Sequence, residues 1–93
     1  MRFTWDQAKA AENLRKHKVS FEEARSVFAD ENARLKHDPD HSQQEDRFII
    51  LGFSERFRLL IVCHAYRGND DVIRIISARK ATPSERKQYG SHL

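Results

Sequence analysis

The segment "RFIILGFSERFRLLIVCHAY" (residues 47–66) is the strongest indication of the fold, because it contains two strongly apolar runs in close succession. The runs cover residues 47–53 and 57–66, and only the tripeptide "SER" separates them. Two apolar runs joined by so short a polar connection predict an antiparallel β-hairpin. The rest of the chain is therefore expected to pack around this hairpin.

Toward the N terminus, the pattern predicts a short strand at residues 3–5 followed by two helices. Asp6 is a suitable N-cap for the first helix, over residues 6–18, whose alanine and leucine positions follow helical spacing. Ser20 and Glu23 have the spacing of a capping box, which opens the second helix. That helix carries one apolar stripe, and "DENA" (30–33) ends it.

Around the hairpin, we expect a strand at residues 33–38, a polar loop, a turn at 67–71 and a strand at 72–78. "TPSE" (82–85) then opens a last helix that runs to about Tyr89, with a second capping box. The element order β-α-α-β-β-β-β-α predicts an α+β fold. We expect one domain, 1–93, in which an antiparallel sheet packs against two N-terminal helices and a basic helix closes the chain.

Composition is typical of a folded globular domain, with 33% charged and 39% apolar residues in 93. No apolar run approaches the roughly 20 residues of a membrane-spanning helix, and the N terminus lacks the apolar segment of a signal peptide. The single Cys63 cannot form an internal disulfide, so we expect a reducing, cytoplasmic location. Cys63 is one of the odd-numbered residues of the second apolar run (57–66), none of which is charged, and this position predicts a buried, inert thiol.

Positive charge is concentrated in the last twenty residues. From Arg74 onward there are five basic residues and one acid, whereas residues 1–73 carry twelve basic and thirteen acidic residues. A local excess of this kind suggests a polyanionic partner, most commonly nucleic acid. A solvated basic helix is the alternative interpretation.

Side-chain alternation suggests which polar groups share a sheet face. The odd positions of 57–66 carry no charge, whereas Arg58 and His64 occupy even positions. Placing Arg74 beside the odd set would bury an unpaired charge, so burial favours a register that puts His64 and Arg74 on one face. There they would combine a proton-transfer group with a phosphate-binding group. The alternative is structural, with His64 hydrogen-bonded at a strand end and Arg74 paired with an acid.

The cluster "HDPDH" (37–41) contains two His and two Asp, which raises the question of a metal site. Its proline and short spacing suit a turn better, and no distant ligand cluster completes a coordination shell. We therefore expect no metal and no cofactor. Gly-rich phosphate loops and nucleophile motifs are absent from the sequence.

Four segments together resemble the BrnT family of toxins from bacterial type II toxin–antitoxin systems. They are "WDQAKAAENLRKHKVSFEEARSVFAD" (5–30), "DPDHS" (38–42), "RFIILG" (47–52) and "IRIISARKATPSERKQY" (73–89). They span nearly the whole chain in the expected order. One departure is Lys18, where the family usually has a glycine that would suit a left-handed helix end.

The resemblance implies a RelE-like fold and metal-independent endoribonuclease activity that inhibits translation. It also implies a BrnA-like ribbon-helix-helix antitoxin, in a 2:2 complex that binds operator DNA. From the lack of a long apolar run we expect no membrane association. The alternative function is a non-catalytic module that binds nucleic acid or antitoxin in operon autoregulation.

If RNA supplies its own 2′-hydroxyl nucleophile, the protein must move protons and stabilise charge on the phosphate. Guanidinium suits the second task, so we assign Arg74 and Arg79 to phosphate stabilisation. His64 is the first candidate for acid/base chemistry. Secondary candidates are Tyr89 and, ranked lower, Glu85, while which group is acid and which is base stays open. Further residues are expected to hold the RNA backbone, with a solvated role as the alternative for each: Lys9, Lys80 and Arg86. Trp5 is expected in the core rather than stacked on a base.

Overall fold

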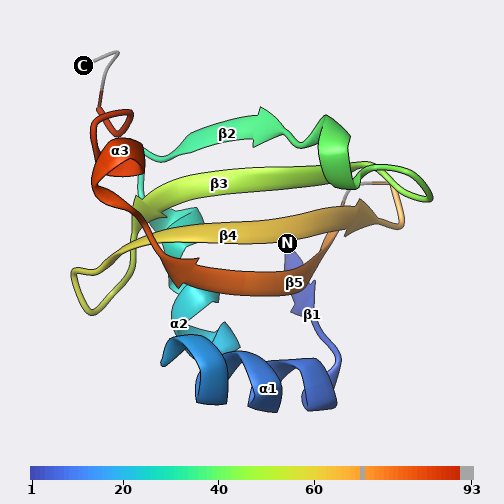
Figure 1. The fold of residues 1–93 in the computed structure, drawn as a ribbon. Helices are drawn as coiled ribbons and strands as arrows, with labels where there is room; N and C mark the ends of the chain where they lie inside the picture. The colour runs from blue at the N-terminus through green and yellow to red at the C-terminus, as the bar shows by residue number, and fades with distance from the viewer. Residues whose placement is uncertain (70, 91–93) are drawn as a thin grey trace.

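The computed structural model describes residues 1–69 and 71–90 and has a five-stranded sheet with the two N-terminal helices on one side (Figure 1). In chain order the elements are β1 (Arg2–Thr4), α1 (Gln7–His17), α2 (Phe21–Ser26), a 3₁₀ turn (Val27–Ala29), β2 (Arg34–His37), a second 3₁₀ turn (Pro39–His41), β3 (Arg47–Phe53), β4 (Leu59–Arg67), β5 (Val72–Lys80) and α3 (Pro83–Arg86). The predicted α+β order is confirmed.

The strands are ordered β1-β5-β4-β3-β2. The hairpin predicted from residues 47–66 is confirmed, since β3 and β4 pair antiparallel from Arg47↔Ala65 to Phe53↔Leu59. Strand β1 pairs parallel with β5, which corrects the expectation of a wholly antiparallel sheet. Two helices and three strands lie between β1 and β5 in the chain, so the connection is far longer than the dozen or so residues that a parallel pair requires.

Both N-terminal helices begin at the predicted caps. The Asp6 carboxylate accepts a hydrogen bond from Lys9 N at 3.0 Å, and Ser20 Oγ accepts one from Glu23 N at 3.0 Å. Lys18 ends α1 with φ 61°, in the left-handed region, and its N–H donates to Leu14 O at 2.9 Å. A lysine therefore occupies a backbone conformation that favours glycine.

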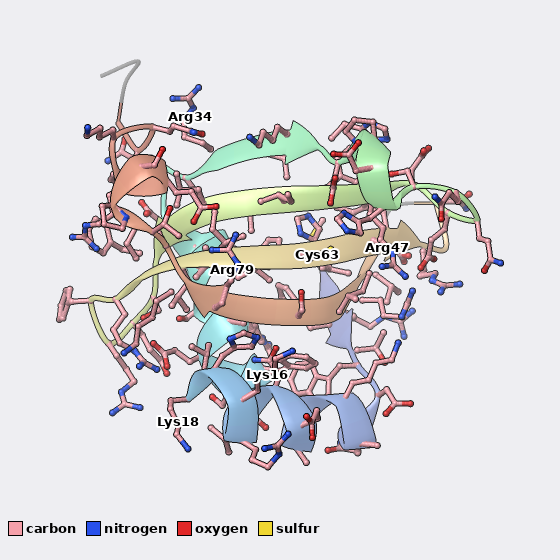
Figure 2. All side chains as sticks on the ribbon, viewed as in Figure 1. Lys16, Lys18, Arg34, Arg47, Cys63 and Arg79 are labelled. Carbon is pink, nitrogen blue, oxygen red and sulfur yellow. The ribbon has the colours of Figure 1, made fainter. Side chains whose placement is uncertain are left out.

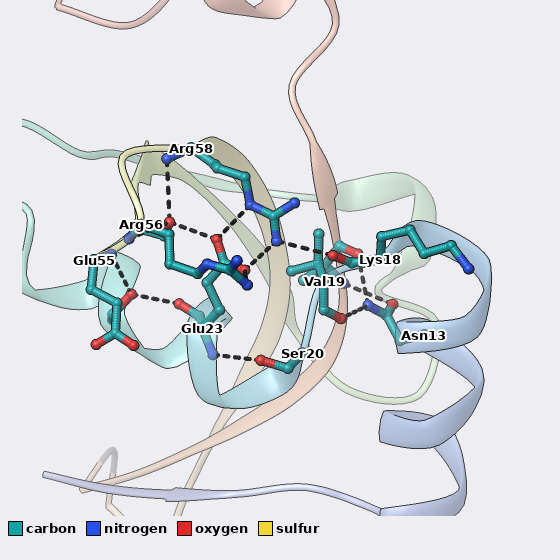
Figure 3. Close-up of polar contacts among 11 residues, drawn as sticks. Asn13, Lys18, Val19, Ser20, Glu23, Glu55, Arg56 and Arg58 are labelled. Atoms are coloured by element: carbon teal, nitrogen blue, oxygen red, sulfur yellow. Dashed lines mark hydrogen bonds and ion pairs between the residues drawn. The ribbon is translucent and has the colours of Figure 1, made fainter.

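The Glu23 side chain does not complete the predicted capping box with Ser20. Its carboxylate instead accepts hydrogen bonds from Arg58 and from Ser54 Oγ, the latter at 2.7 Å (Figure 3). Arg58 also donates to Lys18 O at 2.9 Å. The Arg58 hydrogen bond outweighs the burial of Glu23 and lowers the pKa of that carboxyl. This network joins the end of α1, the start of α2 and the hairpin turn.

The core lies between the sheet and helices α1 and α2. Asn13, on α1, is buried and bridges to β5: its Nδ2 donates to Ala78 O at 2.8 Å and to Val19 O at 2.9 Å, and its Oδ1 accepts from Ala78 N at 3.1 Å. Trp5 packs against the core, in edge-to-face contact with Phe21, as expected. The buried apolar cluster comprises Val19, Phe21, Ala24, Val27, Ile50, Leu60, Val62, Ile73, Ile75 and Ala78.

A bulge in β5 sets which side chains face the helices. Cys63 pairs with Ser77 but His64 pairs with Ile75, so Ile76 is an extra residue on β5. Paired residues share a sheet face. Both Arg74 and Arg79 therefore lie on the face opposite α1 and α2, which we term the open face.

The predicted shared face of His64 and Arg74 is wrong. His64 lies on the helix side with Leu60 and Val62, whereas Arg74 pairs with Ala65 on the open face. Two physical reasons explain the difference. Arg58, whose charge argued against burying the even positions, precedes β4 and pairs with Glu23. The bulge also breaks the alternation on which the register argument depended. Cys63, expected on the buried face, is half-buried on the open face.

The C-terminal helix is shorter than expected. α3 ends at Arg86, and residues 87–90 form turns. The turn expected at 67–71 includes residue 70, which lies outside the described residues. Within the described part of the chain, no helix has the length and apolar character needed to cross a membrane.

Candidate functional site

The open face carries an apolar band bordered by basic side chains at both ends. Rows of paired residues run across it: Arg34–Leu51–Ile61–Arg79, then Lys36–Ile49–Cys63–Ser77, and then Arg47–Ala65–Arg74. Figure 2 shows Arg34 at the end of the sheet near α3 and Arg47 at the opposite end. The face therefore presents two separate arginine groups with a largely uncharged surface between them.

At the α3 end, Arg79 and Glu85 form a two-point ion pair. Arg79 Nη1 and Nη2 donate to Glu85 Oε1 and Oε2 at 2.7 and 2.8 Å. Glu85 also completes the predicted capping box with Thr82, because its Oε1 accepts from Thr82 N at 2.8 Å. The Arg79 hydrogen bonds lower the pKa of Glu85 to about 2, and the same pairing raises the pKa of Arg79.

Tyr89 lies beside this group but points toward the loop after α2. Its hydroxyl donates to Asp30 Oδ2 at 2.7 Å, and its ring packs edge-to-face on Phe53. Burial and the Asp30 carboxylate raise the pKa of Tyr89. Burial would raise the pKa of Asp30, but hydrogen bonds from Phe53 N, Asn32 N and Tyr89 lower it. The phenol therefore ties the C-terminal segment to the domain.

At the other end, three arginines surround one carboxylate. Arg67 Nη2 lies 3.0 Å from Glu45 Oε2, Arg74 Nη2 contacts Glu45 Oε1, and Arg47 Nε lies 3.8 Å from the same oxygen. These side chains line an open hollow of about 540 Å³, together with His41, Gln43 and Gln44. The arrangement leaves a positive excess in a concave site, which suits an anion.

The structure separates Arg74 from Arg79, both of which are predicted to stabilise the phosphate. They pair with Ala65 and Ile61, four residues apart on β4, so their Cα atoms lie about 13 Å apart at ~3.3 Å per residue. Each arginine belongs to a different end of the open face. In this structure the two guanidinium groups are held apart, because Arg74 pairs with Glu45 and Arg79 pairs with Glu85.

His64 is fully buried on the helix side of the sheet. Its ring packs edge-to-face on Phe28 and Tyr66, and its nitrogens lie 3.2 Å from Val62 O and from Tyr66 Oη. Burial lowers the pKa of His64. The imidazole is thus neutral and enclosed at neutral pH, without access to the open face.

The three lysine and arginine residues expected to hold the RNA backbone lie in different places. Lys9 lines a shallow hollow between α1 and Ser77 of β5. Lys80 pairs with Leu60 and so belongs to the helix side, at the end of β5. Arg86 is exposed on α3.

The polar loop before β3 contains a histidine–carboxylate pair that the sequence analysis did not assign. His41 Nδ1 lies 2.8 Å from Oδ2 of Asp38, a nearly buried residue. The pattern "HDPDH" (37–41) points to a turn or a metal motif and not to such a pair, although "DPDHS" (38–42) is part of the family resemblance. Among residues 1–69 and 71–90, no three His, Cys, Asp or Glu side chains are grouped to hold a metal ion.

Comparisons with known proteins agree with one another. Residues 5–85 match a family model described as "Ribonuclease toxin, BrnT, of type II toxin-antitoxin system". The crystal structure of the Brucella abortus ribonuclease toxin, BrnT, is similar in fold, with a TM-score of 0.67. The two sequences are 21% identical, and the match covers 88% of this chain and 97% of that one. No curated protein sequence matches the chain.

Proposed function

Because the chain belongs to the BrnT family of ribonuclease toxins of type II toxin–antitoxin systems, we propose that it cleaves RNA without a metal ion and thereby inhibits translation. The enzyme is an endoribonuclease by family. The open sheet face is the proposed surface for RNA, within one domain spanning residues 1–93.

The chemistry requires little from the protein beyond positioned charge and proton transfer. The 2′-hydroxyl of RNA is a nucleophile within the substrate, so neither a protein nucleophile nor a metal is required for it. Charge on the phosphate in the transition state is stabilised by fixed cations, and the planar guanidinium fork matches phosphate oxygens. In the proposal Arg74 and Arg79 each bind a phosphate of the RNA strand in this way, at opposite ends of the open face.

The observation that carries the proposal is the pair of arginine groups at the two ends of the open face. One contains Arg34 and Arg79, and the other contains Arg47, Arg67 and Arg74. A strand of RNA laid across the apolar band would place different phosphates at the two ends. Single-stranded nucleic acid commonly binds where basic groups flank an uncharged surface on which bases lie.

The other predicted site residues take supporting roles in this proposal. Glu85 orients Arg79 through the two-point ion pair, and Tyr89 fixes the C-terminal segment through Asp30. Lys9, Lys80 and Arg86 add to the attraction of the RNA backbone. His64 stays outside the proposed site, because its buried ring faces the helices.

Membership in a type II system implies an antitoxin partner. The proposed partner is a BrnA-like ribbon-helix-helix antitoxin, in a 2:2 complex that binds operator DNA. The proposed location is the cytoplasm, where RNA and ribosomes are present.

The test is cleavage of naked RNA in EDTA by the wild type, by Arg79→Ala and by the matched control Arg15→Ala. The Arg15 side chain is exposed on α1, and within residues 1–69 and 71–90 its ion pair is with Glu12. We expect the wild type and the Arg15 variant to cleave, and the folded Arg79 variant to lose most activity. Arrest of cleavage by EDTA would contradict metal independence. RNA that stays intact but bound, even when ribosomes are added, would favour the non-catalytic module.

A further inference from the structure

The proposed function lacks a general base once His64 is placed on the buried face. His41 lines the open hollow at the Arg74 end. Resting on the proposed function, we propose that His41 is the base that activates the RNA 2′-hydroxyl, that Asp38 positions it, and that Arg47, Arg67 and Arg74 bind the reacting phosphate.

Asp38 is held firmly enough to orient the imidazole. Its backbone N–H donates to Arg47 O at 2.8 Å, its carbonyl accepts from Ser42 Oγ, and its side chain is only 10% exposed. His41, at the end of the 3₁₀ turn, is 66% exposed and contacts this carboxylate through Nδ1. A proton on Nδ1 shared with Asp38 leaves Nε2 as the acceptor nitrogen, which is the tautomer that a base requires.

Arg47, Arg67 and Arg74 form a binding site for a phosphate, which we call the phosphate seat and which the Glu45 carboxylate occupies in this structure. Glu45 contacts all three, and His41 lines the same hollow. The Nε atoms of Arg47 and Arg74 are buried and have no hydrogen-bond partner among the described residues. Buried donors without acceptors are costly, so these two atoms favour a ligand with more acceptor oxygens than one carboxylate offers. A phosphodiester has that character and the same charge as Glu45.

The proposed step conserves atoms and charge. His41 Nε2 takes the proton of the 2′-hydroxyl, the O2′–P bond forms, and the P–O5′ bond breaks. The departing 5′-oxygen takes a proton from water, and the imidazolium returns its proton to solvent. The products are a 2′,3′-cyclic phosphate and a 5′-hydroxyl. The arginines stabilise the charge on the pentacoordinate phosphate between these events.

The first test compares His41→Ala with His37→Gln on RNA, with ribosomes added if the wild type requires them. His37 is the matched control, because it ends β2 only four residues before His41 and pairs with Phe48, on the other side of the sheet. We expect His41→Ala to lose 10²- to 10⁴-fold in cleavage rate while binding an uncleavable 2′-deoxy oligonucleotide as tightly as the wild type. Added imidazole should restore part of the lost rate, which a structural role would not allow.

Two further variants separate the positioning and binding roles. Asp38→Asn should lower kcat at least tenfold with little change in KM, because the imidazole loses its orientation but the phosphate seat remains. Glu45→Gln should bind the uncleavable oligonucleotide several-fold more tightly, since it removes the competing anion.

The outcomes distinguish this inference from the proposed function. If the wild type cleaves and His41→Ala cleaves equally well, the inference is overturned and the proposed function stands. If the wild type cleaves no RNA with or without ribosomes, the proposed function fails and the inference fails with it. Weaker binding by Glu45→Gln would overturn the phosphate seat.

Discussion

Arg79 and Glu85 join the end of β5 to α3 through two hydrogen bonds of 2.7 and 2.8 Å. The pKa of Glu85, lowered to about 2, lies well below the ordinary value of 4.5 that applies in the unfolded chain. At pH values between about 2 and 4.5, the Glu85 carboxylate therefore takes up a proton when the protein unfolds. The stabilisation by this carboxylate is complete above pH 4.5 and is lost as the pH falls toward 2.

Glu85→Gln should remove this contribution while keeping the capping-box acceptor for Thr82 N. We expect the free energy of unfolding to fall by roughly 1 kcal/mol at pH 6, since the pair is partly exposed to solvent, and by much less at pH 2.5. Urea denaturation at both pH values measures the difference. Glu12→Gln is the control, because its pair with Arg15 is mostly exposed. Equal losses at both pH values for Glu85→Gln would refute the argument.

The buried imidazole of His64 predicts a second pH dependence, of the same sign. Burial lowers its pKa below the ordinary 6.5, so the unfolded chain binds a proton that the folded protein excludes. Stability should fall as the pH drops below 6.5, by up to about 1.4 kcal/mol per pH unit. His64→Gln removes the titration, so its urea midpoint should change less than that of the wild type between pH 7.5 and 5.5. RNA binding should be unchanged; a specific loss of binding in the folded variant would return His64 to the site.

Asn13 makes three hydrogen bonds that join α1, Val19 and β5 inside the protein. Asn13→Leu has a similar volume but leaves Ala78 N and two carbonyl oxygens without partners. We expect a loss of about 3 kcal/mol in the free energy of unfolding, measured by urea denaturation. The nearby exposed substitution Leu14→Asn should cost less than about 1 kcal/mol. A loss for Asn13→Leu as small as that for Leu14→Asn would show that water replaces these contacts.

Lys18 occupies the left-handed region at φ 61°, where a side chain is strained. Lys18→Gly should therefore raise the free energy of unfolding by about 0.5 to 1 kcal/mol, and its backbone oxygen can still accept from Arg58. Lys16→Gly, in the helical part of α1, should do the opposite and cost about 1 kcal/mol. Thermal unfolding of the two variants side by side provides the check. Destabilisation of both would indicate that the Lys18 side chain has a role of its own.

Most helices and strands, and the α+β class of the fold, follow from local sequence patterns. Local signals specify helix starts at Asp6, Ser20 and Thr82, because a side-chain oxygen three residues before a backbone N–H is a short-range arrangement. The apolar runs at 47–53 and 57–66 likewise define the hairpin. The motifs also show the family resemblance, because the order of residues along the chain can be compared without knowing the three-dimensional structure.

Which residues share a site depends on tertiary contacts that local sequence patterns do not specify. The bulge at Ile76 reversed the alternation of β5, so Arg74 and Arg79 came to one face and His64 to the other. The pairing of Arg58 with Glu23 also joins distant segments. Because Arg58 is neutralised there, the even-numbered side chains of β4 can be buried without an unpaired charge. His41 approached the three arginines through a loop whose path no periodic pattern encodes. The face of the sheet on which a side chain lies depends on contacts between distant segments, and a bulge of one residue is enough to move the following side chains to the other face.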